Sequence, residues 1–257
     1  MKVVILAGGF GTRISEESHL KPKPMLEVGD KPILWHIMKS YCAQGFNEFV
    51  ICCGYKSYVI KEYFADYFLH NCDLTFDFRD HRNTMEVHTN LTDSWQVTLV
   101  DTGLHTMTGG RLKRVRQYLG NETFMLTYGD GVSDVDLNAL LKFHKEHGKT
   151  ATITAVHPEG RFGVMDVEDL NISAFREKNA HDVGWINGGF MVMEPQVFER
   201  IKNDETVLEK EPLEGLAADG ELLAYKHEGF WRCMDTQRDK AKLEELWEED
   251  EAPWKVW

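Results

Sequence analysis

The first thirteen residues constrain the fold of this chain more than any other segment. Residues 3–6 form a short apolar, β-branched run, which is typical of a buried strand in a parallel sheet. The run leads into residues 8–11, where three glycines let the backbone turn sharply and approach a ligand closely. Backbone N–H groups in such a loop bind anions. Arg13 adds a forked cation, and Lys21 and Lys23 follow, so this region is predicted to bind phosphates.

The residues after the glycines argue against two other nucleotide-binding loops. A nucleotide-hydrolase P-loop requires Gly-Lys-Ser/Thr, and this chain has Gly11-Thr12-Arg13. A dinucleotide-binding loop requires a third glycine where Ile14 stands. A plain strand-to-loop turn remains an alternative, because glycine is the ordinary turn residue. The clustered cations favour an anion site instead.

Charge and hydropathy limit the partners that we expect. The 257 residues carry a net charge of -13. A protein surface that binds nucleic acid is broad and basic, so no nucleic-acid partner is expected. Lys2 is followed by only a few apolar residues before the glycines, and no apolar run approaches the roughly 20 residues that span a bilayer. We therefore expect a cytoplasmic protein with no membrane partner. The five cysteines lack zinc-ligand spacing and are expected to be reduced thiols.

Strand-like and helix-like segments alternate through the first two thirds of the chain. Apolar strand-like runs at 49–53, 124–127 and 150–156 are separated by amphipathic helical patterns. This alternation predicts an α/β fold with a Rossmann-like mixed, mostly parallel sheet flanked by helices. We expect a single domain over residues 1–257, with an inserted hairpin or loop region at 70–100. A C-terminal helix and tail are expected at 237–257, with the terminal tryptophans docked on the body or on a neighbouring subunit.

Two aspartates are candidate metal ligands. Asp130 lies between two glycines after a buried strand, at the strand end where α/β sheets bind ligands. Mg²⁺ takes few protein carboxylates and shares its other positions with water and phosphate oxygens. Asp235, which precedes a helix-like segment, is the second candidate. The alternatives are an Asp-Gly turn for Asp130 and a helix N-cap for Asp235.

A second glycine turn, residues 108–111, leads into a cationic helix-like segment. Its glycines would permit close contact with a flat ligand such as a base, and Arg111 would donate to base acceptors. Lys178 has the plain alternative of a surface lysine. Spacing reveals neither a convincing zinc site nor a nucleophilic triad.

Taken together, these motifs resemble the sugar-1-phosphate nucleotidylyltransferases, and within them the glucose-1-phosphate cytidylyltransferases. The resemblance covers nearly the whole chain and rests on LAGGFGTR at 6–13, KPKPM at 21–25, MTGGRLKR at 107–114, TYGDG at 127–131, INGGF at 186–190 and MDT at 234–236. One departure is Asn179, where proline usually follows the lysine. The resemblance implies a mostly parallel sheet between helices and a homo-oligomer, either a trimer or a hexamer.

The implied reaction transfers the cytidylyl group of CTP to α-D-glucose 1-phosphate, giving CDP-glucose and pyrophosphate with Mg²⁺ as cofactor. The attack is in line and forms no covalent enzyme intermediate, because the attacking phosphate is already ionised at neutral pH. The product feeds CDP-linked dideoxyhexose synthesis for surface polysaccharide (O-antigen). Since a dianion approaches a tetra-anion, catalysis is expected to consist of positioning and charge neutralisation.

The resemblance also assigns roles to residues. Arg13 is expected to stabilise the leaving pyrophosphate and Lys23 the α-phosphate, as the catalytic residues. The implied nucleotide-binding residues are Leu6, Ala7, Gly8, Gly9, Gly11, Thr12, Arg13, Lys23, Thr108, Gly109, Arg111 and Gly129. The implied sugar-phosphate residues are Tyr128, Lys178, Asn187 and Gly188. Asp130 and Asp235 are expected to hold the Mg²⁺.

Base choice is the least determined part of the interpretation. Cytosine differs from uracil and thymine at its exocyclic amine and N3, and our hypothesis is that Arg111 and the backbone of 108–110 read part of this difference. A UTP- or dTTP-using sugar-1-phosphate pyrophosphorylase is therefore an alternative. A catalytically silent, nucleotide-sugar-binding regulatory homologue is another. The joint presence of Arg13, Lys23, Asp130, Lys178 and Asp235 argues against that second alternative.

Overall fold

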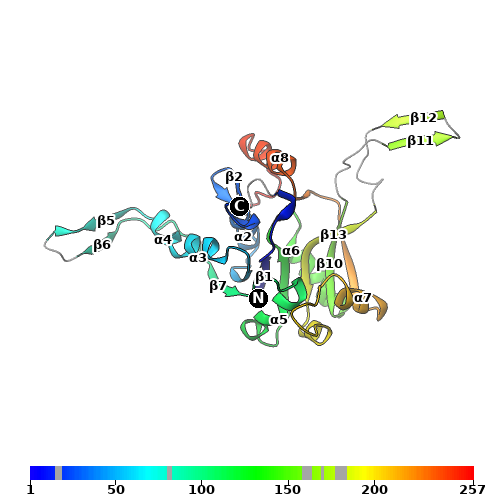
Figure 1. Cartoon of the computed structure of the whole chain (residues 1–257), viewed down its shortest axis with the longest axis horizontal. Coiled ribbons are helices and arrows are strands. Elements are labelled where there is room, and N and C mark those ends of the chain that lie inside the picture. The colour runs from blue at the N-terminus through cyan, green and yellow to red at the C-terminus, as the bar shows by residue number, and fades with distance from the viewer. Residues whose placement is uncertain (15–18, 80–82, 158–163, 169–170, 177–183) are drawn as a thin grey trace.

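The computed structural model describes residues 1–14, 19–79, 83–157, 164–168, 171–176 and 184–257, with only the backbone described for Arg13, 164–168 and 171–176. A seven-stranded sheet in the order β14-β10-β13-β8-β1-β4-β7 forms its centre (Figure 1). The strands are β1 (Lys2–Ala7), β4 (Glu48–Cys53), β7 (Gln96–Asp101), β8 (Phe124–Tyr128), β10 (Ala151–Val156), β13 (Ile186–Met193) and β14 (Leu222–His227). β13 runs antiparallel to β8 and β10, and the other pairings are parallel. The predicted mixed, mostly parallel α/β fold is confirmed.

Helices cover both faces of this sheet, as the composition of β1 requires. Successive side chains of a strand point to opposite faces. Val3 and Ile5 pack in one buried cluster with residues of α2, α6 and α8, and Val4 and Leu6 pack in the other with α5 and α7. The helices are α2 (Ile33–Ala43), α3 (Ser57–Ala65), α4 (Tyr67–His70), α5 (Thr108–Leu119), α6 (Leu137–His147), α7 (Glu211–Ala218) and α8 (Gln237–Glu248). A strand buried on both faces needs a continuous apolar run, and residues 3–6 supply it.

Short elements complete the described chain. The 3-10 helices are η1 (Thr12–Ile14), η2 (Lys23–Met25) and η5 (Pro195–Arg200). The two-stranded antiparallel pairs are β2 (Glu27–Val28) with β3 (Lys31–Pro32), β5 (Leu74–Asp77) with β6 (Thr84–Val87), β9 (Gly131–Ser133) with β15 (Trp231–Cys233), and β11 (Val164–Glu168) with β12 (Asn171–Arg176). Among the described residues, no helix is long and apolar enough to cross a membrane.

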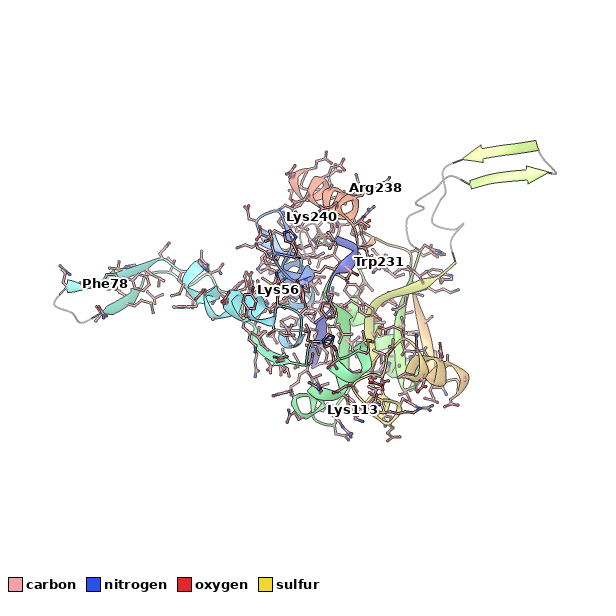
Figure 2. All side chains as sticks on the ribbon, in the orientation of Figure 1. Lys56, Phe78, Lys113, Trp231, Arg238 and Lys240 are labelled. Carbon is pink, nitrogen blue, oxygen red and sulfur yellow. The ribbon has the colours of Figure 1, made fainter. Side chains whose placement is uncertain are left out.

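The region 70–100, expected to be a single insertion, contains two separate parts in the structure. β5 pairs with β6, so the part of this region that includes residues 74–87 forms a hairpin, one of the two forms expected. Residues 96–101 form β7, which extends the main sheet beside β4 instead of belonging to the insertion. Val97 and Leu99 pack on the main core, and this packing explains why β7 separates from the hairpin. The hairpin projects away from the sheet, with the exposed Phe78 beside its tip (Figure 2).

The C-terminal tail docks on the body of its own chain. Trp254 is only 1% exposed, and its Nε1 donates a hydrogen bond to His36 Nδ1 at 3.3 Å. Its ring also stacks with Phe230 and Trp247. Trp254 is therefore docked on the body, as one of the two predicted arrangements had it, and not on a neighbouring subunit.

Candidate active site

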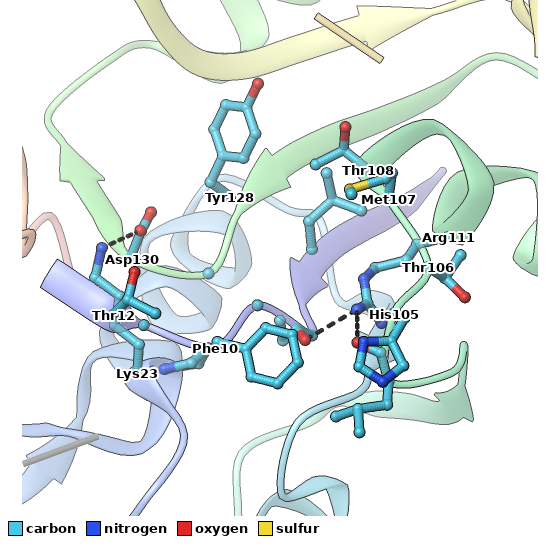
Figure 3. Close-up of a pocket in the computed structure, with 18 of the residues that line it drawn as sticks. Phe10, Thr12, Lys23, His105, Thr106, Met107, Thr108, Arg111, Tyr128 and Asp130 are labelled. Carbon is cyan, nitrogen blue, oxygen red and sulfur yellow. Dashed lines mark hydrogen bonds and ion pairs between the residues drawn. The ribbon is translucent and has the colours of Figure 1, made fainter. Parts of the chain in front are cut away.

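A cavity of about 520 Å³ opens at the carboxyl ends of β1 and β8, between the glycine loop and residues 104–108 (Figure 3). Its lining includes many of the residues selected from the sequence: Leu6, Ala7, Gly8, Gly9, Gly11, Thr12, Lys23, Thr108, Arg111, Tyr128, Gly129, Asp130 and Asp235. The glycine loop of residues 8–11 and the turn at residues 129–131 therefore meet at this cavity. Their meeting follows from the parallel pairing of β1 with β8, in which Leu6 lies opposite Tyr128.

The glycine loop and the turn at residues 129–131 touch through their backbones. Gly129 N donates to Leu6 O at 3.0 Å, and a Cβ at Gly129 would lie only 3.0 Å from that same oxygen. Gly11 has a φ of +65°, a conformation that favours glycine, and the chain then enters the short helix η1. Close packing of the strand ends therefore favours glycine at position 129, and the backbone conformation favours it at position 11.

Lys23 lies between two carboxylates at the edge of the cavity. Its Nζ is 2.5 Å from Asp130 Oδ2 and 2.6 Å from Asp235 Oδ1, while its own side chain is 11% exposed. Burial by itself lowers the Lys23 pKa, but the charges and hydrogen bonds of Asp130 and Asp235 outweigh burial and leave the pKa raised. Lys23 therefore keeps its positive charge in the cavity.

Backbone pairing brings the two aspartates together from distant parts of the chain. β9 pairs with β15, so Gly131 lies opposite Cys233, and Met234 N donates to Asp130 O at 2.8 Å. Asp130 does occupy a turn, but its carboxylate is also directed at Lys23. The helix-cap alternative for Asp235 is wrong, because Thr236 caps α8 in a capping box with Asp239.

The Asp130–Asp235 pair suits a divalent cation in its donor chemistry. The two carboxylates already converge on one cationic group, the Lys23 ammonium. Mg²⁺ is commonly bound by one or two protein carboxylates together with substrate phosphate oxygens. The described residues contain no group of three or more His, Cys, Asp or Glu that could hold a metal. A carboxylate pair completed by substrate phosphates therefore fits Mg²⁺ better than an all-protein site.

Arg111 lies under the loops that border the cavity, and it is 5% exposed. Its Nη1 donates to Thr102 Oγ1 and Gly103 O, at 2.8 and 2.7 Å. Its Nη2 donates to Gly8 O and Leu104 O, at 3.0 and 3.2 Å. These protein acceptors occupy the four terminal N–H groups, so the geometry gives Arg111 a role in holding loops together. Direct contact of Arg111 with a base stays a prediction.

The glycines of the turn at residues 108–111 let helix α5 pack closely against the segment 204–208. A Cβ at Gly109 would lie 2.8 Å from Thr206 O, and one at Gly110 would collide with the Asp204 backbone. The space expected to admit a flat ligand is occupied by the segment 204–208. Gly109 lies outside the cavity lining, and its contact with a nucleotide also stays a prediction.

The predicted sugar-phosphate residues are only partly placed. Tyr128 lines the cavity, and Asn187 Nδ2 donates to its hydroxyl at 3.1 Å. Gly188 and Asn187 lie outside the lining, and Gly188 O accepts a hydrogen bond from Trp231 Nε1 at 2.7 Å. Lys178 and the Arg13 side chain lie outside the described residues.

Sequence reasoning missed two features of the site. Phe10, Leu104 and Met107 form an apolar rim on the cavity, each 43–48% exposed, and the Phe10 ring lies 5.9 Å from that of His105. Exposed apolar residues in two separated loops carry no periodic signal. Glu209, which accepts hydrogen bonds from the hydroxyls of Tyr128 and Thr108, was also missed. A single glutamate in a polar segment is indistinguishable from a surface charge in the sequence.

Comparisons with known proteins place the chain in a family. The model for nucleotidyl transferases matches residues 2–248. A glucose-1-phosphate cytidylyltransferase of Salmonella typhi is 58% identical over 258 aligned positions, and a probable glucose-1-phosphate cytidylyltransferase of Bacillus subtilis (strain 168) is 44% identical over 259, each covering 100% of both chains. The crystal structure of HddC from Yersinia pseudotuberculosis shares the fold, with a TM-score of 0.69 at 22% identity over 96% of this chain and 99% of that one. The chain therefore belongs to the nucleotidyl transferase family.

Proposed function

We propose that this protein transfers the cytidylyl group of CTP to α-D-glucose 1-phosphate, giving CDP-glucose and pyrophosphate. The observation that carries the chemistry is Lys23 held between Asp130 and Asp235 beside the glycine loop. The choice of CTP and of glucose 1-phosphate is supported by full-length relatives that are named glucose-1-phosphate cytidylyltransferases, at 58% and 44% identity.

In the proposed reaction, a phosphate oxygen of the sugar attacks the α-phosphorus of CTP. A bond forms between that oxygen and the α-phosphorus, the bond to the oxygen bridging the α- and β-phosphates breaks, and its electron pair leaves on pyrophosphate. Both reactants are anions, so the residues act by neutralising charge and holding the reacting atoms in line. Backbone donors of the glycine loop bind the nucleotide phosphates, and the charged Lys23 faces the α-phosphate.

The remaining roles follow the family pattern. Arg13 stabilises the departing pyrophosphate, and Lys178 holds the incoming sugar phosphate. Asp130 and Asp235 would hold Mg²⁺, which when bound polarises phosphate oxygens and neutralises part of their charge. No nucleophilic side chain takes part, because the sugar phosphate is already ionised.

Pyrophosphate release tests this proposal. The protein is incubated with Mg²⁺, each of ATP, CTP, GTP, UTP and dTTP, and a panel of sugar 1-phosphates. We expect release with CTP and α-D-glucose 1-phosphate well above every other pair. Preference for UTP or dTTP would establish the alternative pyrophosphorylase, and no release with any pair would favour a silent regulatory homologue.

We also propose that the chain forms a homo-oligomer, a trimer or a hexamer. The projecting β5–β6 hairpin supports this proposal, because Phe76 and Phe78 stack at 6.1 Å and are 49% and 69% exposed. Apolar surface of this kind is usually covered by protein. Light scattering on the purified chain and on a Phe76→Ser/Phe78→Ser variant tests it, with a monomeric mass of the unaltered chain as the contradicting result.

A further inference from the structure

Glu209 connects two cavity residues that come from different elements. Its Oε1 accepts a hydrogen bond from the Tyr128 hydroxyl at 2.7 Å, and its Oε2 accepts one from the Thr108 hydroxyl at 2.6 Å. Tyr128 ends β8 and Thr108 begins α5, and both line the cavity. One carboxylate therefore spans the two sides of the site.

The directions of these hydrogen bonds are determined by the groups involved. A carboxylate only accepts, so each hydroxyl directs its single proton to Glu209. Each hydroxyl also accepts one hydrogen bond: Tyr128 from Asn187 Nδ2 at 3.1 Å, and Thr108 from Leu208 N at 2.9 Å. Asn187 is itself oriented, because its Oδ1 accepts from Gly189 N at 2.9 Å. The result is a continuous network from Asn187 to Thr108 in which the donors on both sides point toward Glu209.

The segment that carries Glu209 is held firmly against α5. Met107 N donates to Asp204 O at 2.8 Å, and Gly110 N donates to Thr206 O at 3.2 Å. Arg114 Nε adds a charged hydrogen bond to Asp204 Oδ1 at 2.9 Å. Because this segment is anchored, the Glu209 carboxylate has a fixed position, and it orients the side chains that donate to it.

We propose that Glu209 is a positioning residue that couples the nucleotide side of the site to the sugar-phosphate side. The assignment rests on the proposed function, in which Thr108 contacts the nucleotide and Tyr128 and Asn187 contact the sugar phosphate. Glu209 touches neither reacting atom. It sets the rotamer and proton direction of Tyr128 and Thr108, so that binding of one substrate orders the network for the other.

The network explains why the residue is a glutamate. A glutamine of the same shape offers one acceptor oxygen and one NH₂ donor, so one of the two hydroxyls would face a donor. If that hydroxyl is Tyr128, its proton would have to turn toward Asn187 Nδ2, which is also a donor. Glu209→Gln therefore leaves one polar group unpaired, whereas an aspartate is too short to reach both hydroxyls.

Steady-state kinetics with both substrates varied tests the proposal. Glu209→Gln is expected to raise KM for both CTP and glucose 1-phosphate by about tenfold or more, with a smaller fall in kcat, as for loss of a hydrogen bond to a charged group. Glu211→Gln is the matched control, since it breaks only the exposed pair of Glu211 with Lys202 and should leave both KM values unchanged. The assignment would be overturned if Glu209→Gln left both KM values unchanged, or if its whole loss of activity appeared as a lower kcat.

A double-mutant cycle separates coupling from general damage to the fold. Thr108→Val and Tyr128→Phe should have non-additive effects on KM in the unaltered chain and additive effects in the Glu209→Gln background. Additivity in both backgrounds would refute the coupling. If the unaltered chain releases no pyrophosphate from CTP and glucose 1-phosphate, the proposed function fails, and calorimetric titration of CTP and of glucose 1-phosphate, each with and without the other, still measures the coupling in the same variants.

Discussion

Arg111 Nη2 donates a hydrogen bond to the carbonyl oxygen of Gly8 at 3.0 Å, and this contact joins helix α5 directly to the glycine loop. A Cβ at Gly8 would collide with the Arg111 guanidinium. Two motifs a hundred residues apart are therefore parts of one packing unit. The first glycine of the loop makes room for the arginine that holds the loop in place.

Replacing Arg111 should weaken the whole site rather than change its base preference. Arg111→Ala leaves several buried carbonyl oxygens without donors and opens a cavity under the loops, which should cost about 2–4 kcal/mol of unfolding free energy. Turnover should fall for every nucleotide that the protein accepts. Urea unfolding and the nucleotide panel measure both effects, and a selective loss of the CTP preference at near-normal stability would instead make Arg111 the base reader.

Lys23→Ala should lower kcat far more than CTP affinity. The charge of Lys23 is expected to act where negative charge builds up on the α-phosphate, and losing such a group costs roughly 2–4 kcal/mol of transition-state stabilisation. Single-turnover rates and equilibrium CTP binding separate the two effects. Lys21→Ala is the control, because Lys21 is exposed and pairs with Glu27 away from the cavity. A Lys23→Ala protein with an unchanged rate would remove Lys23 from the reaction.

Asp130→Asn should abolish Mg²⁺-dependent turnover. The substitution removes one of the two carboxylates that face a common cation, and several kcal/mol of lost charge stabilisation correspond to about a 100-fold or greater fall in rate. Initial rates over a Mg²⁺ titration, with EDTA as the metal-free limit, measure the effect. Asp219→Asn, which breaks an exposed pair with Arg200, should behave as the unaltered chain. Normal Mg²⁺ dependence in Asp130→Asn would refute the metal assignment.

His36 should make stability fall at mildly acidic pH. Its Nε2–H donates to Val28 O at 2.8 Å and its Nδ1 accepts from Trp254, so the folded imidazole is neutral. Burial lowers the His36 pKa to about 4, whereas an unfolded histidine titrates near 6.5. The unfolded state therefore binds the proton first, and the contribution of His36 to stability is complete above about pH 6.5 and is lost as the pH falls toward 4.

The expected loss from His36 is about 3 kcal/mol in total. Urea unfolding followed by tryptophan fluorescence at pH 7 and pH 4.5 measures it. His36→Gln should lower stability at pH 7 and flatten the pH dependence, whereas His88→Gln, at an exposed position, should leave the slope unchanged. An equal slope in His36→Gln would show that other groups carry the acid sensitivity.

Local pattern was sufficient for the architecture and for part of the site. An apolar run buried on both faces, the glycine turn after it and the alternation of strands and helices are properties of short segments, and the parallel sheet follows from them. The structure of the region 70–100 was harder to predict. Alternating residues at 74–78 and 96–100 look alike in sequence, but β7 joins the main sheet, whereas among the described strands β5 pairs only with β6.

The sequence by itself determined the fold class, the glycine loop after the first strand and membership of a family, because these depend on residue order within short windows. Only the tertiary structure decided which side chains meet. Lys23 is 107 residues from Asp130 and 212 from Asp235, yet it contacts both. Arg111 holds the loops beside the cavity, and Glu209 accepts hydrogen bonds from both Tyr128 and Thr108. Strand pairing and helix packing bring these groups within hydrogen-bonding distance. Contacts between residues so far apart depend on the register and direction of the whole sheet, which no local motif records.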